Sequence, residues 1–215
     1  VMDPVHMIDV LDIGNSQAPR GHYIYELFNI DRVAKTGISG LTSRTTGGIR
    51  PSCVGFYAGR VWFGGINHPK YANNVYYTQI IERDEQIGRC YQLNDPTSES
   101  LSDLLDTDGG EIKIADMGSL TAFFTSKSNL VLFATNGIWN ISGSGAEGTG
   151  FVATDFAVSR ISNTSTPSAL SLVEAEGTPF WWNFDGIWTI QPTQTGGIAV
   201  SNLSNDTIKT FFQNI

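Results

Sequence analysis

The chain has 215 residues, 40% of them hydrophobic, and its 21 acidic residues against 13 basic ones give a net charge of −8. This length is enough for one large domain with a buried core, and the acidic balance disfavours tight wrapping of nucleic acid, because phosphate binding needs concentrated Lys and Arg. No apolar run approaches the roughly 20 residues that span a bilayer, and residues 1–4 lack the pattern of a signal peptide.

Residues 1–50 differ in composition from the rest of the chain. Residues 9–13 and 23–28 alternate between apolar and polar side chains, or nearly so, which predicts strands, whereas residues 35–48 are rich in Gly, Ser and Thr and predict a linker. We therefore expect an N-terminal segment, 1–50, joined to a main body that spans 51–215.

The main body contains repeated hairpin patterns. In residues 130–141 and 180–190 an apolar strand runs into Asn136-Gly137 or Asp185-Gly186 and leaves through Ile-Trp. Asn-Gly and Asp-Gly supply the two positive-φ residues of a type I′ turn, which joins antiparallel strands. A repeated hairpin predicts an all-β fold with a β-propeller-like body, one hairpin per blade.

Further strands complete this prediction. A weaker third copy of the hairpin turns at Ala58-Gly59, and a short non-β excursion, with turn residues and one possible helical turn, falls near 94–110. Three further strands are predicted in the main body, at residues 74–81, 111–114 and 120–124. The Gly-rich residues 143–150 are predicted to form the tip of a hairpin. The chain ends in an apolar helical pattern, residues 206–215, so we expect it to be part of a longer protein.

Two groups of carboxylates resemble known sites. Asp106 and Asp108, before Gly109, are spaced like the start of a calcium loop, but the later oxygen ligands of an EF-hand are missing, and a solvated turn is the alternative. Glu174 and Glu176 alternate like a pair of glycosidase carboxylates, but Glu176-Gly177 also has the composition of an ordinary hairpin turn.

The tryptophans, histidines and cysteines do not define a site from their spacing alone. The five tryptophans, Trp181 and Trp182 among them, either form a sugar-stacking platform or fill the core between blades. The histidines and cysteines show no zinc-ligand spacing; they are His6, His22, His68, Cys53 and Cys90. We expect both cysteines to be free, buried thiols rather than a disulfide.

Eight short sequence segments, spread along nearly the whole chain from residue 20, carry a resemblance to a known protein family. They are residues 20–24, 50–63, 94–99, 106–110, 136–139, 151–156, 185–188 and 202–208. This order and spacing resembles the tail nozzle, or tail tubular protein, family of short-tailed bacteriophages, which are β-propeller proteins of the virion.

The resemblance implies a structural role without catalytic residues, cofactor, metal or small-molecule substrate. It implies a homohexameric ring below the portal and adaptor of the viral tail, assembled in the host cytoplasm, around a channel through which viral DNA leaves. An acidic wall suits such a channel because it repels phosphates. The loop-rich residues 35–48 are a candidate for reaching a neighbouring subunit.

A second hypothesis comes from a different class of protein. A glycan-binding or glycan-cleaving propeller would use exposed tryptophans together with Glu174 and Glu176. Burial separates the two hypotheses, because a stacking platform exposes Trp faces and a core tryptophan does not.

Overall fold

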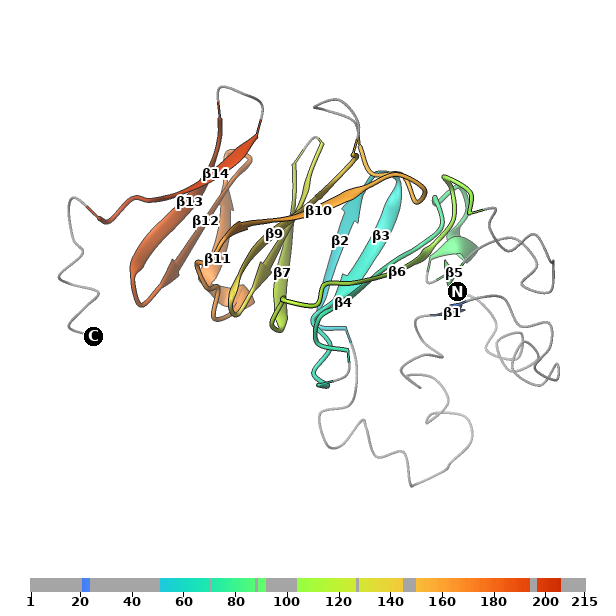
Figure 1. Cartoon of the computed structure of the whole chain (residues 1–215), viewed down its shortest axis with the longest axis horizontal. Coiled ribbons are helices and arrows are strands. Elements are labelled where there is room, and N and C mark those ends of the chain that lie inside the picture. The colour runs from blue at the N-terminus through green and yellow to red at the C-terminus, as the bar shows by residue number, and fades with distance from the viewer. Residues whose placement is uncertain are drawn as a thin grey trace. The chain divides into compact units, whose positions relative to one another are not determined.

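The computed structural model describes residues 21–23, 51–69, 71–87, 89–91, 104–126, 128–144, 150–193 and 197–205 (Figure 1). The strand predicted at 9–13, the linker at 35–48 and the helical pattern at 206–215 lie outside these residues. So does the strand predicted at 23–28, except for Tyr23, the last residue of β1 (Gly21–Tyr23).

The chain divides into two compact units. The first unit comprises Val1–Ile114 and Val152–Thr154, and the second comprises Ala115–Phe151 and Asp155–Ile215. The prediction of one domain over 51–215 stays a prediction.

The first unit contains a four-stranded antiparallel sheet. Its strands, in spatial order, are β2 (Cys53–Tyr57), β3 (Arg60–Gly64), β4 (Asn74–Tyr77) and β6 (Gly110–Lys113). A short 3-10 helix, η2 (Asp84–Gln86), follows β4, and β5 (Arg89–Tyr91) pairs with β1. Tertiary contacts end β4 at Tyr77 rather than at residue 81 as predicted, because Ile80 N–H donates to Thr107 O (3.1 Å) and Ile81 N–H to Gly59 O (2.9 Å).

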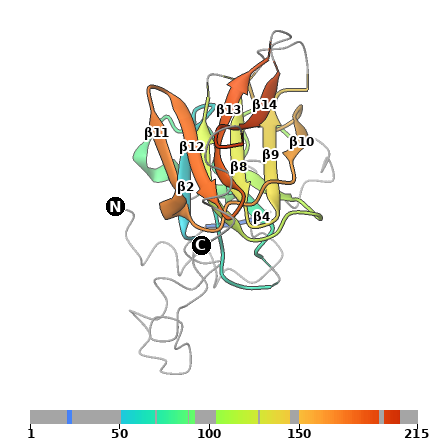
Figure 2. The same ribbon diagram turned by 90° about the vertical axis from the view of Figure 1, so that its left-hand side faces the viewer.

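The second unit contains two four-stranded antiparallel sheets that lie face to face (Figures 1 and 2). One sheet consists of β7 (Leu120–Thr125), β8 (Leu130–Ala134), β9 (Gly137–Ser142) and β10 (Ala157–Ser162). The other consists of β11 (Leu172–Ala175), β12 (Thr178–Asn183), β13 (Gly186–Pro192) and β14 (Ile198–Asn202), with the 3-10 helix η3 (Ala169–Ser171) before it.

In both sheets of the second unit, strands that follow one another in sequence are neighbours in space. The first unit departs from this order only where β5 pairs with β1 instead of joining its sheet. A four-stranded antiparallel meander is the architecture of a propeller blade, so the predicted all-β fold built from blade-like hairpins is confirmed. Propellers have at least four blades, and the described residues form three such sheets without closing a ring.

Type I′ turns occur at two of the hairpins. Ala58 and Gly59 have φ of 51° and 71°, and Glu176 and Gly177 have φ of 52° and 74°. Both turns connect the first and second strands of their sheets. The hairpin at Ala58 is therefore the structural counterpart of the hairpin at Glu176, not of the two Gly-Ile-Trp hairpins.

The type I′ prediction is wrong at the first Gly-Ile-Trp hairpin. Ala134 pairs with Gly137, so the two turn residues lie one position earlier than predicted, and neither Asn136 nor Gly137 has a positive φ. The Asn136 side chain instead links to the loop before β7: its Oδ1 accepts from Gly118 N–H (2.7 Å) and its Nδ2 donates to Asp116 O (2.9 Å).

The second Gly-Ile-Trp hairpin shows the same displacement. Asn183 pairs with Gly186, and Asp185 does not have a positive φ, so the type I′ prediction is wrong here too. Asn183 Oδ1 accepts from Asp185 N–H (2.9 Å), which forms an Asx turn. Gly186 has a φ of 131°, and a Cβ built on it would lie 1.9 Å from Ser204 Oγ, so glycine is required by conformation and by close packing.

The left-handed conformation of Ala58 leads to a stability prediction. The left-handed region costs most residues with a Cβ roughly 1–2 kcal/mol, whereas asparagine tolerates it because its short polar side chain can hydrogen-bond to the nearby backbone. We expect Ala58→Asn to raise the free energy of unfolding by about 1 kcal/mol, measured by urea denaturation. Thr135→Asn, at a turn position without positive φ, is the control and should give no comparable gain; an equal gain in both variants would contradict the explanation.

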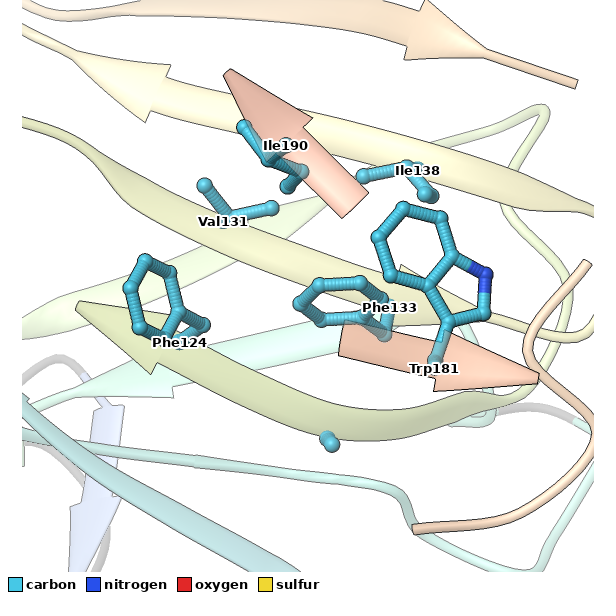
Figure 3. Close-up of a cluster of buried hydrophobic side chains, with 7 residues drawn as sticks. Phe124, Val131, Phe133, Ile138, Trp181 and Ile190 are labelled. Carbon is cyan, nitrogen blue, oxygen red and sulfur yellow. The ribbon is translucent and has the colours of Figure 1, made fainter. Parts of the chain in front are cut away.

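The core of the second unit lies between its two sheets (Figure 3). The Trp181 ring meets Phe133 edge-on, with ring centroids 5.1 Å apart. Buried residues of both sheets complete this cluster: Ala122, Phe124, Val131, Ile138 and Ile190. The packing explains why β12 and β13 carry aromatic and β-branched residues on the face that they present to the other sheet.

Candidate functional site

The oxygen-rich turn at Asp106–Gly109 surrounds a buried arginine. Arg60, the first residue of β3, has no exposed surface. Its Nη1 donates to Thr78 O (2.7 Å), Thr107 O (3.1 Å) and Asp108 O (2.5 Å), and its Nη2 donates to Asp106 O. The carbonyl groups that a calcium loop would turn toward a metal ion are therefore directed at a guanidinium group.

Charge and ring contacts complete this arginine site. The Arg60 guanidinium lies 5.6 Å from the centroid of the Tyr77 ring. Burial lowers the pKa of Arg60, while the nearby Tyr77, Asp108 and Asp106 raise it. Because an arginine begins with a very high pKa, it remains a cation at neutral pH, and its charge strengthens the bonds to the carbonyl groups.

The two acids of the predicted calcium loop have different surroundings. Asp108 is fully buried, and its Oδ2 accepts from Leu105 N–H (2.9 Å). Asp106 is exposed, and Thr154 Oγ1 donates to its Oδ1. The solvated-turn interpretation is thus correct for Asp106 and wrong for Asp108, whose carboxylate holds the turn closed around Arg60.

The carboxylates of the glycosidase hypothesis do not face an enclosed site. Glu174 lies on β11 and Glu176 in the turn to β12, and both side chains are exposed. The positive φ of Glu176 and Gly177 confirms that these residues form the hairpin turn. The turn therefore accounts for Glu176, and Glu174 is an exposed residue of β11.

The five tryptophans divide between core and surface. Trp62, Trp139 and Trp181 are buried, and Trp188 is partly buried against the cluster around Trp181. Trp182 is 53% exposed. Core packing thus accounts for four of the five, and Trp182 remains as the one tryptophan that is open to a ligand or partner.

Trp182 belongs to an exposed apolar surface on the sheet of β11–β14. Val173 pairs with Phe180, and Trp182 follows Phe180 at an alternate position, so these three side chains share the sheet face opposite Trp181. Phe184 follows in the turn between β12 and β13. Val173 is 61% exposed and Phe184 76%. We name the surface formed by Val173, Phe180, Trp182 and Phe184 the β12 face.

A second exposed apolar surface lies on the sheet of β2–β6. Val54 pairs with Phe63 and Phe56 with Val61, which places all four side chains on one face. Val54 is 65% exposed and Phe56 61%, whereas Val61 and Phe63 are partly buried. We name this surface the β2 face.

These surfaces contrast with strand β8, where all five residues are buried and both faces are covered. Soluble monomers rarely leave large apolar side chains grouped in water, and such groups mark interaction surfaces. Neither face was predicted from the sequence, although a signal was present. Strands β2 and β12 have large apolar residues at adjacent positions, the pattern of strands covered on both sides.

Both cysteines are free, as predicted, with Cys90 buried and Cys53 partly buried. Burial raises the pKa of Cys53 to about 12, opposed in part by a hydrogen bond with the Gly64 backbone, and burial likewise raises the pKa of Cys90. Since the thiolate is the reactive form, two thiols whose pKa is raised in this way stay protonated and inert at neutral pH.

This setting leads to a labelling prediction. At pH 8 we expect iodoacetamide to modify the folded protein at least about 100-fold more slowly than a free cysteine peptide. In urea, both cysteines should react at the peptide's rate, which serves as the control. Mass spectrometry measures the extent of labelling over time. Rapid labelling of the folded chain would contradict the burial of these thiols.

Those of the remaining candidates that the structure describes do not form a cluster. The His68 ring packs 5.2 Å from the Tyr71 ring, His22 lies on β1, and His6 is outside the described residues. Within the described part of the chain, no three His, Cys, Asp or Glu side chains converge to hold a metal ion. No helix among the described residues is long and apolar enough to cross a membrane.

Comparison with known proteins adds no family assignment. No family model matches the chain, and no curated protein matches its sequence. The features that bear on function are therefore the fold, the two apolar faces and the net charge.

Proposed function

We propose that the protein is a structural component of a bacteriophage tail, a subunit of the nozzle ring through which the viral DNA leaves. The observation that carries this proposal is the presence of two apolar sheet faces, the β2 face and the β12 face, open to solvent. A ring subunit needs two different contact surfaces, because each copy touches one neighbour on either side.

The charge of the chain supports the same function. With a net charge of −8, the surface repels phosphate groups, so DNA passing through a ring would form few ion pairs that slow it. Rigid, meandering sheets suit a wall that must keep its shape during ejection. The role requires neither a catalytic cluster nor a cofactor.

The test of this proposal is assembly with tail partners. The purified protein is mixed with the portal and adaptor proteins of its own virus and examined by sedimentation and negative-stain microscopy. We expect it to add a ring to the end of the adaptor. A protein that remains free in the presence of both partners would overturn the assignment to the tail.

One observation favours a second candidate, a glycan-binding module: Trp182 is exposed beside Phe184. Sugar rings stack on such aromatic faces. In this case Trp182 fluorescence should change on addition of a glycan from a panel of bacterial surface oligosaccharides, and Trp182→Ala should abolish the change. The exposed positions of Glu174 and Glu176 give the cleaving form of this hypothesis no comparable support.

A further inference from the structure

We infer that, in the assembled ring, the β12 face of one copy packs against the β2 face of the next copy. This inference rests on the proposed function, since it names the surfaces that join the subunits. It would make the contact heterologous, with two different surfaces meeting head to tail.

The chain itself shows how such sheets stack. In the second unit, the sheet β11–β14 uses one face, with Trp181, to pack against Phe133 of the neighbouring sheet. Its other face, the β12 face, also carries aromatic and aliphatic residues, of which Val173, Trp182 and Phe184 are exposed and Phe180 is partly buried. A further sheet laid on the β12 face would bury them in the same manner.

Charge argues against two β12 faces packing on each other. Residues 161–205 contain no Lys or Arg, and their three acidic residues are exposed. Glu174 pairs with Pro179 and so lies on the same face as Trp181, whereas Glu176 and Asp185 lie in the turns at the two ends of β12. A twofold contact between identical sheets would bring only acidic groups together, which is unfavourable where water is excluded. The partner surface must therefore be apolar and less acidic.

The β2 face meets both requirements. Its sheet is apolar around Val54 and Phe56, and strand β6 adds Glu111 and Lys113, both exposed and opposite in charge. Register places Glu111 opposite Tyr76, and Tyr76 opposite Phe63, so these side chains lie on the same side of the sheet as the β2 face. Lys113, two residues after Glu111, supplies a cation there for the acidic groups beside the β12 face.

The contact is tested with two double variants, each of which damages one face. Trp182→Ser with Phe184→Ser damages the β12 face, and Val54→Ser with Phe56→Ser damages the β2 face. Because exposed positions are replaced, circular dichroism and thermal unfolding should show that both variants fold. Val158→Ser, at a 36% exposed position on β10, is the matched control.

Analytical ultracentrifugation gives the expected results. Wild type and the Val158→Ser control should assemble, whereas each double variant alone should associate at least about 30-fold more weakly. An equimolar mixture of the double variants should form dimers only, since one intact β12 face and one intact β2 face remain to pair. This complementation would show that the contact is heterologous.

Other outcomes overturn the inference in distinguishable ways. Double variants that assemble like wild type would place the interface elsewhere and leave the ring proposal standing. Monomeric variants that fail to pair when mixed would indicate a contact between identical faces. A wild-type chain that stays monomeric would mean that another part of the same chain or another protein covers these faces, and the tail assignment would then depend on the portal and adaptor experiment.

Discussion

Trp181→Ala is expected to lower the free energy of unfolding by about 4 kcal/mol, in the range measured for truncation of large buried aromatic residues. Trp181 is 1% exposed and lies between the two sheets of the second unit against Phe133 (Figure 3). Truncation removes this contact and leaves a cavity that strands paired on both sides of β12 cannot close. Urea denaturation measures the change.

A second substitution separates packing from hydrogen bonding at the same position. Among the described residues, the buried Nε1 of Trp181 has no hydrogen-bond partner, and such a group costs roughly 1–3 kcal/mol. Trp181→Phe removes this unpaired group together with part of the ring. The gain and the loss partly cancel, so we expect the free energy of unfolding to fall by only about 1 kcal/mol. Trp182→Ala, measured where the chain is monomeric, is the control on the opposite face and should change stability by less than about 1 kcal/mol.

Equal effects of Trp181→Ala and Trp182→Ala would contradict this description of the core. The two tryptophans are adjacent in sequence and differ only in the face that they occupy. The comparison therefore tests the register of β12 directly, because a shift of one residue exchanges the buried and the exposed side chain.

Arg60→Met is expected to lower the free energy of unfolding by about 4 kcal/mol as well. The substitution keeps much of the side-chain volume but removes the donors to the carbonyl groups of Thr78, Asp106, Thr107 and Asp108. Each buried acceptor left without a partner costs roughly 1–3 kcal/mol, and some will be reached by water. Arg60→Lys keeps the charge but has fewer donors in a different geometry, so we expect an intermediate loss.

The control for this prediction is Arg83→Met, at an exposed arginine, where we expect a change within about 0.5 kcal/mol. If Arg60→Met unfolded at the same urea concentration as wild type, Arg60 would not hold the turn together. Addition of calcium should leave the unfolding midpoint of wild type unchanged, because the carbonyl groups are directed at Arg60. A calcium-dependent increase would restore the metal hypothesis for Asp106 and Asp108.

The strands of the fold were predictable because their pattern is local. Residues 120–124 and 130–141 alternate or run apolar between turn residues, and β7, β8 and β9 form there. The turn geometry was less predictable. Gly137 follows Asn136, yet it is the first residue of β9: a Cβ there would lie 2.7 Å from Ser162 O, an approach that depends on a distant strand.

The candidate sites depended still more on distant contacts. Asp106 and Asp108 suggested a metal because both stand in one short segment, whereas Arg60, which their turn binds, lies far from them in the sequence. Likewise, Trp182 has the composition of a core residue, and only the pairing of β11, β12 and β13 places it on the exposed face. Local patterns therefore predict strands well and site membership poorly.

The mass and shape of the protein in solution show whether it forms a ring around a channel. Light scattering with negative-stain microscopy of the purified protein measures both. We predict an assembly with six times the 23.4 kDa mass of one chain and images with sixfold symmetry and an axial channel. A monomer that binds glycans and ignores the portal and adaptor would contradict the claim and favour the glycan-binding alternative.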